Sequence, residues 1–277
     1  MFKQPNTIII LYSDSVKNYL ANVFIFKLKM GCIETRGQPS EELAVIFAER
    51  GLQLHLISSK KTDSIFRKYS YNSKLNQSQL KRVSENLLIP IKNYSTHKNI
   101  TEMYLSLKGE DGDYKLYDLL IIGVMLSKSD PKTKSRLLFQ IFDEKSENKI
   151  NFPKLKTEII PSILKHCCVT LPSLVCKGQS NMANEMKNVF YVEKLKKGFQ
   201  AASKLIAESM APIRTIIDEE IFVNFFVTFR NGLLLAPQGV RAYVSEVSDT
   251  LVDEHDKLKL PKNKENSHVD SIDPALD

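Results

Sequence analysis

The chain has 277 residues, of which 43% are hydrophobic and 26% are charged, and its formal net charge is +7. This composition is typical of a soluble globular protein of one or two domains and excludes a disordered chain, a collagen-like repeat and a disulfide scaffold. Only 10 residues are Gly and none is Trp, which favours helices over a turn-rich sandwich or barrel.

Charge is distributed unevenly along the chain. Residues 246–277 contain nine Asp or Glu and four Lys, a net charge of −5, so residues 1–245 carry +12. A basic body with an acidic tail suits an anionic membrane surface or an acidic partner, although a requirement for solubility would also explain it. We expect residues 246–277 to form an acidic flexible tail.

Residues 1–29 precede the part of the chain with globular patterning. Their apolar pieces are short and broken by polar residues, a weak match to a secretory signal. A mitochondrial presequence stays open, although the lack of Arg counts against it. Met30 begins Met-Gly-Cys-Ile-Glu-Thr, which fits the N-myristoylation pattern, with Gly31 acylated and Cys32 available for palmitoylation. Because an internal motif is inert, this lipidation hypothesis requires translation to start at Met30. Residues 1–29 are then a non-structural extension, and the alternative is a targeting segment.

The four cysteines form a poor disulfide framework, because two of them are adjacent. They indicate a reducing, cytoplasmic compartment. His166, Cys167, Cys168 and Cys176 match no common zinc-ligand spacing, and burial in the core explains these cysteines better. No apolar run approaches the ~18 residues that a transmembrane helix requires.

The main organisation is a repeated unit of helix, polar loop with one apolar residue, and helix. The best copy starts with Asp130 as N-cap and Pro131 at the first helical position. Its loop, Asp143–Lys154 (loop three), begins with Asp. It has the flexible residue Asn148 sixth and the apolar residue Ile150 eighth, which is the pattern of an EF-hand loop.

Three further copies share the apolar eighth residue. Loop two, Leu107–Asp118, has Tyr114 at this position and Gly sixth. Loop one, around Leu75, is about two residues short of the twelve in an EF-hand loop. Loop four, around Ile216, follows an insertion near 170–195. Because the eighth residues of paired loops form a short β-bridge in this pattern, four copies predict two pairs.

The chain thus resembles the EF-hand superfamily, in its calcineurin B-like, neuronal calcium sensor and calaxin branch. The run from Tyr117 to Asp143 carries the resemblance, through a Ser-x-x-x-Pro-x-x-Lys linker between two apolar helices. The resemblance implies an all-α fold of two EF-hand-pair lobes, that is, four degenerate helix-loop-helix units with β-bridges between paired loops. We place the lobes at residues 30–127 and 128–245.

Calcium requires about six or seven oxygen ligands, which come from loop positions 1, 3, 5, 7, 9 and 12. Loop three offers Asp143, Glu147 and Asn151. It places Lys145 at position 3 and Lys154 at position 12, where an ammonium repels the ion. Across the loops, the weak calcium candidates are Asp143, Glu147, Asn151, Asp111, Asp113, Asp118 and Glu220. We expect no cofactor and, at most, weak binding of calcium.

The resemblance also suggests a function, since paired lobes of this kind hold an amphipathic helix of a protein partner in an apolar groove. We therefore expect a non-catalytic adaptor or regulatory subunit whose calcium binding is largely or wholly lost. The residues expected to line the groove or the core are Leu119, Ile122, Met125, Phe222, Phe225 and Phe226.

Two alternatives stay open. One is a calcium-responsive sensor that regulates a phosphatase, kinase or dynein, and the other is a structural subunit of a ciliary or cytoskeletal assembly. The chain has no common nucleotide-binding, metalloprotease or nucleophile motif, so we do not expect an enzyme. Its basic runs lack interleaved aromatic residues, so we expect no binding to nucleic acid. The expected location is cytoplasmic, with membrane attachment if Gly31 is acylated, or ciliary or cytoskeletal under the second alternative.

Overall fold

The computed structural model describes residues 39–91, 98–143, 145–176, 182–210 and 215–259, with the backbone alone for 252–259. The predictions for residues 1–29, for Gly31 and Cys32 and for residues 260–277 lie outside the described residues. The described residues are mostly helical, and the strands among them form two two-stranded sheets, so the prediction of an all-α protein is confirmed.

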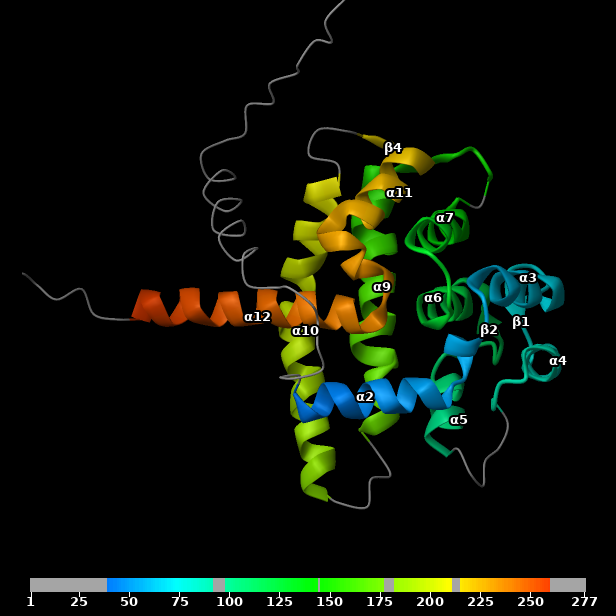
Figure 1. Ribbon diagram of the computed structural model, residues 1–277, viewed down its shortest axis with the longest axis horizontal. Helices are drawn as coiled ribbons and strands as arrows, with labels where there is room; N and C mark the ends of the chain where they lie inside the picture. Colours follow the sequence, from blue (N-terminus) through cyan, green and yellow to red (C-terminus); the bar gives the residue numbers. More distant parts are fainter. Residues whose placement is uncertain (1–38, 92–97, 144, 177–181, 211–214, 260–277) are drawn as a thin grey trace, which may run out of the picture. The chain divides into compact units, whose positions relative to one another are not determined.

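Side-chain caps explain where several helices begin. Asn76 and Gln79 form a capping box at one helix start, and the Asp130 and Asp218 carboxylates accept from backbone N–H groups at two others. The longer helices, labelled in Figure 1, are α2 (Ser40–Gly51), α3 (Ser59–Tyr69), α4 (Gln77–Leu87), α5 (Lys98–Leu105), α6 (Leu116–Leu126), α7 (Pro131–Phe142), α10 (Met182–Met210), α11 (Glu219–Thr228) and α12 (Pro237–Lys259).

The two sheets join the loops in pairs. Strand β1 (Lys74–Leu75) pairs antiparallel with β2 (Tyr114–Lys115), and β3 (Lys149–Asn151) pairs antiparallel with β4 (Ile216–Asp218). Leu75 lies opposite Tyr114, as the eighth-position pattern predicts. The prediction for loop four is wrong by one residue, because the partner of Ile150 is Ile217. Ile217 is buried, whereas Ile216 is 53% exposed.

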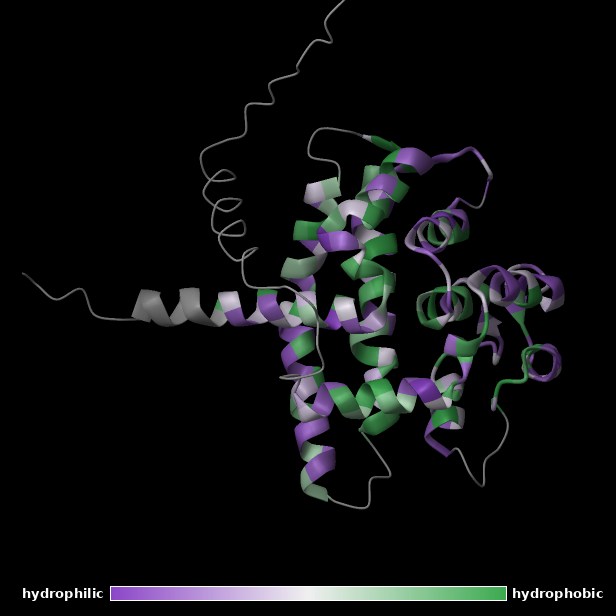
Figure 2. Ribbon diagram, in the orientation of Figure 1, coloured by the Kyte–Doolittle hydropathy of each residue, from purple (hydrophilic) through white to green (hydrophobic). Residues whose placement is uncertain are grey.

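A continuous helical segment follows loop three. It comprises α8 (Phe152–Lys154), a π-turn (Leu155–Ile159), α9 (Ile160–Lys165), a second π-turn (His166–Thr170) and a 3₁₀ turn (Pro172–Val175). This segment is long enough and apolar enough to cross a membrane, but most of it is buried inside the protein. It lies beside α10, and Figure 2 shows it as largely hydrophobic. The segment therefore reads as a core helix.

Most of the predicted insertion and the start of the predicted flexible tail are helical. Most of the predicted insertion near 170–195 belongs to the end of the segment after loop three and to the first half of α10. The predicted flexible tail starts too early, because α12 continues through residues 246–259. Val240, Val244 and Val247 are buried at helical spacing, so the start of the acidic segment extends a packed apolar face.

The buried apolar side chains form one continuous cluster that extends from Leu52 near α2 to Val247 in α12. A chain of aromatic contacts crosses it, in which the Phe139 ring of α7 meets Phe222 of α11 with centroids 5.5 Å apart. At the other end Phe229 meets Tyr243 of α12 at 5.4 Å. The helices after loop three are thus part of the same core as the paired loops.

Candidate functional site

Loop two keeps its acidic residues engaged within the protein. The Asp111 carboxylate forms an ion pair with Lys74 from strand β1 and accepts a hydrogen bond from the Asp113 backbone N–H at 3.2 Å. The hydrogen bond from Lys74 is the main reason why the pKa of Asp111 is lowered, and the same bond raises the pKa of Lys74. A lysine of loop one thus neutralises the carboxylate that loop two presents.

Asp118, the last residue of loop two, points into the protein. It is buried, and its Oδ1 lies 2.7 Å from Nε2 of the buried His166. Nδ1 of the same imidazole lies 3.2 Å from the Thr170 hydroxyl, so both ring nitrogens have a partner. This arrangement fastens loop two to the second π-turn and leaves the Asp118 carboxylate turned toward an imidazole.

Loop three is closed by backbone hydrogen bonds to its first residue. The two Asp143 carboxylate oxygens accept from the N–H groups of Glu147 at 3.0 Å and Asn148 at 2.8 Å. Asn148 is left-handed with φ 55°, as is Gly112 at the equivalent place in loop two with φ 80°. This conformation favours Gly and Asn, which agrees with the flexible sixth residue that the sequence predicts.

The twelfth residue of loop three, Lys154, supplies a cation of its own. Its Nζ donates to the Phe142 carbonyl oxygen at 2.9 Å and so ties the end of the loop to the end of α7. Asn151 acts as the N-cap of α8, and its Oδ1 accepts from the Lys154 backbone N–H at 2.8 Å. Two of the predicted calcium candidates in this loop, Asp143 and Asn151, therefore serve as caps for backbone groups.

The remaining calcium candidate, Glu220, is exposed on the first turn of α11. If Ile217 is counted as the eighth residue of loop four, as its pairing with Ile150 suggests, the twelfth position falls on Ile221 and not on Glu220. Within the part of the chain that the structure describes, no three His, Cys, Asp or Glu side chains come together in a way that would hold a metal ion.

The residues predicted to line a groove are mostly core residues. Leu119, Ile122, Met125, Phe222 and Phe226 are at most 1% exposed. Phe225 is partly buried and packs against Phe226 and Phe229. The apolar faces of α6 and α11 are therefore covered by the protein's own helices and not left as an open groove.

Those covering helices can be named from their contacts. Helix α6 packs against α3, α7 and the second π-turn, while α11 packs against α7 and α10 and the 3₁₀ turn Leu233–Leu235. Helix α10 packs along α12, which also contacts the second π-turn. An amphipathic partner helix would have to displace these elements to reach Leu119 or Phe222.

A cleft of about 480 Å³ opens between loop two and the turns that follow α9. Its apolar lining includes Met103, Leu107 and Val169, and its polar lining includes hydroxyl groups and lysines. Asn99 of α5 also lines the cleft, and its Nδ2 donates to the Leu174 carbonyl oxygen at 2.9 Å.

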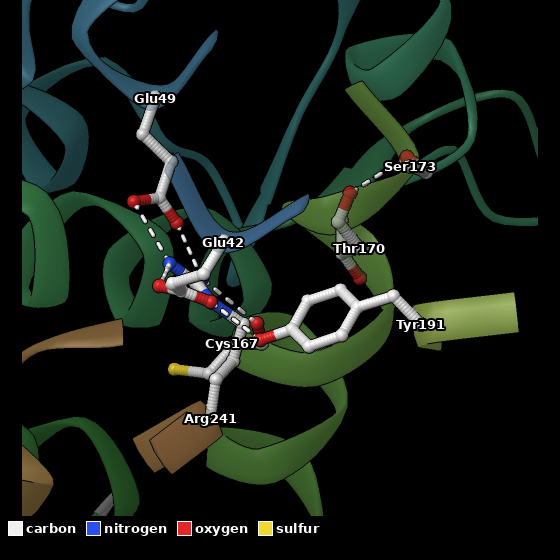
Figure 3. Close-up of polar contacts among 7 residues, drawn as sticks. All are labelled: Glu42, Glu49, Cys167, Thr170, Ser173, Tyr191 and Arg241. Carbon is white, nitrogen blue, oxygen red and sulfur yellow. Dashed lines mark hydrogen bonds and ion pairs between the residues drawn. The ribbon is translucent and has the colours of Figure 1, made fainter. Parts of the chain in front are cut away.

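A buried charge cluster holds the covering helices together, and Figure 3 shows it in detail. Arg241 of α12 is completely buried and donates to the Glu42 and Glu49 carboxylates of α2, at 2.8 Å and 2.6 Å for the shortest contacts. Its Nη1 also donates to the Cys167 carbonyl oxygen in the second π-turn at 3.2 Å. The Tyr191 hydroxyl of α10 donates to Glu42. The cluster thus joins four elements.

Burial controls the acid–base properties of this cluster. Desolvation raises the pKa of Glu49 despite its contact with Arg241, and it raises the pKa of Tyr191, whose hydroxyl faces the Glu42 carboxylate. Burial also raises the pKa of the Cys168 thiol to about 12. Cys167 and Cys168 are free thiols in the core, as their predicted burial requires.

Sequence reasoning did not find this cluster, because its members are up to 199 residues apart and follow no local pattern. It also treated His166 only as a zinc candidate, although the imidazole binds Asp118 and Thr170. Comparison with protein-family profiles, curated proteins and solved structures finds no match for the chain.

Proposed function

We propose that the chain is a non-catalytic adaptor built on an EF-hand-like frame that keeps its conformation without calcium. The proposal rests on the hydrogen bonds made by the twelfth residues of loops two and three. Lys154 occupies the twelfth position of loop three and binds Phe142, and Asp118 at the twelfth position of loop two binds His166. Groups of the protein itself thus hold the ends of both loops.

Two observations support the EF-hand-like frame. Each short sheet pairs two loops through their apolar eighth residues, Leu75 with Tyr114 and Ile150 with Ile217. The sixth residues of loops two and three are left-handed, which gives the sharp turn that an EF-hand loop requires at that place. Both features depend on backbone conformation and persist when the ligand side chains are lost.

Two features support the adaptor function: the predicted groove residues are buried, and residues 1–245 carry a net positive charge. The predicted groove residues are buried under the chain's own helices, so a protein partner is expected to dock on an outer surface. The basic body, with +12 on residues 1–245, favours an acidic partner or an anionic membrane. This docking mode replaces the amphipathic helix in a groove.

Calorimetry of the full chain tests the calcium part of the proposal. Titration of the wild-type chain with calcium to millimolar concentration is expected to give no saturable heat. The double variant Lys145→Asp, Lys154→Glu places carboxylates at positions 3 and 12 of loop three and is expected to gain a calcium site. A control variant, Lys149→Glu, Lys156→Glu, makes the same change of charge at exposed residues outside those two positions.

The possible results separate the two halves of the proposal. Saturable binding by the wild-type chain would contradict calcium independence. Absence of binding by the double variant, if it stays folded, would contradict the EF-hand-like loop. Equal binding by the control variant would show that added negative charge alone attracts the ion.

Affinity capture tests the adaptor function directly. The tagged full chain is expressed in its native cell type, and captured proteins are identified by mass spectrometry in buffer containing either calcium or EGTA. An adaptor that ignores calcium is expected to retain the same partners in both buffers. Partners that are released by EGTA would favour the calcium-sensor alternative, and capture of no specific protein in either buffer would contradict an adaptor.

A further inference from the structure

The cleft beside loop two has a rim of lysines. Lys108 and Lys115 reach it from loop two, and Lys165 reaches it from the end of α9. Lys115 and Lys165 are exposed, and Lys108 is partly buried with its Nζ 5.5 Å from the centre of the Tyr114 ring. Three lysines from two elements distant in sequence therefore line one concave surface.

These lysines are not neutralised by nearby acids. No carboxylate of the described residues lies within ion-pair distance of Lys108, Lys115 or Lys165. The cleft contains two carboxylates, and both are engaged elsewhere: Glu102 pairs with Lys98 at 3.8 Å, and Asp118 binds His166. The lining therefore contains three lysines and two carboxylates, a net charge of +1, and its lysines have no ion-pair partner among the described residues.

The floor of the cleft is apolar. Met103 and Leu107 are buried beneath it, and the partly buried Val169 forms the opposite side. The hydroxyl hydrogens of Ser106 and Ser173 are already donated to the Met103 and Thr170 carbonyl oxygens. A ligand that fits must therefore combine negative charge at the rim with apolar groups on the floor.

We propose that this cleft is the docking site for an acidic segment of the protein partner, in which carboxylates alternate with apolar side chains. The carboxylates would pair with Lys108, Lys115 and Lys165, and an apolar side chain would cover Met103, Leu107 and Val169. The volume of about 480 Å³ lies within the range of about 300–1,000 Å³ in which binding pockets fall. This inference rests on the proposed adaptor function and names the chemistry of its partner.

The same features make an inorganic phosphate or a nucleic acid a poorer fit. A wholly polar anion would leave the partly exposed Val169 side chain in contact with water, so it would gain nothing from covering that side chain. Among the residues that the structure describes, those that line the cleft include no aromatic side chain on which a base would stack. An acidic and apolar peptide satisfies both the rim and the floor.

Fluorescence anisotropy of the full chain with a labelled octapeptide tests the inference. In the probe, Glu and Asp alternate with Leu and Val, and a second probe replaces the acidic residues with Lys. We expect saturable binding of the acidic probe, weakened by raised salt because the contacts are ionic. The lysine probe is expected not to bind.

The variant Lys115→Glu, Lys165→Glu is expected to weaken binding of the acidic probe by at least about tenfold, because two attractions become repulsions. The matched control Lys60→Glu, Lys61→Glu reverses two exposed lysines on α3, outside the cleft lining, and is expected to bind as the wild-type chain does. Circular dichroism checks that both variants keep their helices. Unchanged binding by the cleft variant, or equal loss in the control, would overturn the inference.

Competition and capture complete the test. Inorganic phosphate that displaces the probe at submillimolar concentration would overturn the peptide assignment and favour a phosphate site. If affinity capture finds partners that the cleft variant retains in full, the cleft inference fails while the adaptor function stands. If the probe binds the wild-type cleft and no partner is captured, the inference stands as peptide chemistry and the adaptor function fails.

Discussion

Arg241 uses every hydrogen-bond donor of its guanidinium inside the protein. Nε, Nη1 and Nη2 all donate to the carboxylates of Glu42 and Glu49, and Nη1 also donates to the Cys167 carbonyl oxygen. Two buried carboxylates share one buried cation, so the cluster has an excess of acid. Desolvation is the main reason why the pKa of Glu49 is raised; the nearby Glu42 carboxylate adds to this shift, and Arg241 opposes it.

The burial of Glu49 gives a pH-dependence of stability that Glu49→Gln is expected to remove. Because the pKa of Glu49 is higher in the folded state than its ordinary value of 4.5, the folded state binds more protons above pH 4.5. The contribution of Glu49 to the free energy of unfolding therefore falls as pH rises through the folded pKa. Urea denaturation across this range should show the variant gaining stability relative to the wild-type chain.

A suitable control for this prediction is Glu85→Gln, because Glu85 is exposed on α4 and forms only a surface pair with Lys81 at 3.7 Å. The difference in unfolding free energy between this control and the wild-type chain should stay nearly constant with pH. A constant difference for Glu49→Gln as well would show that Glu49 does not carry the pH-dependence.

At the scale of elements, α10 and α12 pack closely at a contact point where α10 has a glycine, Gly198. A Cβ atom on Gly198 of α10 would lie 2.5 Å from the Val244 carbonyl oxygen of α12 and 3.0 Å from the Ser248 Cβ. Backbone atoms cannot move aside as a flexible side chain does. The spacing of the two helices, and with it the place of Arg241, depends on a residue without a side chain.

Gly198→Ala is therefore expected to destabilise the protein although Ala favours helices by about 1 kcal/mol. The steric clash pushes α10 and α12 apart, and overpacking of this kind costs about 1–3 kcal/mol. The matched control is Gly51→Ala at the end of α2, where the nearest atom, Ile100 Cδ1, lies 3.6 Å from the added Cβ. Chemical denaturation should find Gly51→Ala neutral or stabilising, and an equally harmless Gly198→Ala would refute the close crossing.

At the scale of the whole molecule, one core links both pairs of loops. Leu119 lies in the half of the chain with loops one and two, and Phe222 lies in the half with loops three and four, yet both belong to the same buried cluster. Helices that enter after loop three cover both halves. The described residues from Ser40 onward form a single compact unit.

Leu119→Ala and Phe222→Ala are each expected to lower the free energy of unfolding by about 2–5 kcal/mol, because each leaves a cavity in the core. A continuous core also predicts that either variant shifts the same single thermal transition. Hydrogen exchange should show lost protection in α3 and α6 for Phe222→Ala, far from the substitution. Two separate transitions, each sensitive to one substitution, would instead reveal lobes that fold independently.

How much of this the sequence predicts depends on whether a feature is local. The sequence identifies the paired loop residues Leu75, Tyr114 and Ile150, because each is an apolar residue inside a polar loop. The helix cap at Asp130 and the left-handed turn at Asn148 follow from the residue types at those positions. The register of loop four was missed because Ile216 and Ile217 are both apolar and adjacent. Only burial distinguishes them.

Features that depend on tertiary contacts were not predictable in this way. Apolar helices such as α6 and α11 have the same pattern whether a partner or the chain's own helices cover them, so groove and core are indistinguishable in sequence. The contacts of Arg241 join residues 192 and 199 positions apart. Likewise, the lysine-lined cleft assembles loop two and α9 from segments about 50 residues apart, which no motif records.

The bond from Lys154 to the Phe142 carbonyl oxygen has a consequence for timing. A free ion exchanges with the solvent, so the angle between the helices on either side of its loop follows the concentration of that ion. A side-chain ammonium is covalently tethered, and its effective concentration at the loop is constant whatever the surrounding medium. Under the proposed function, the angle between α7 and α8 would therefore not depend on the calcium concentration, and a partner-binding surface on these helices would be present at all times.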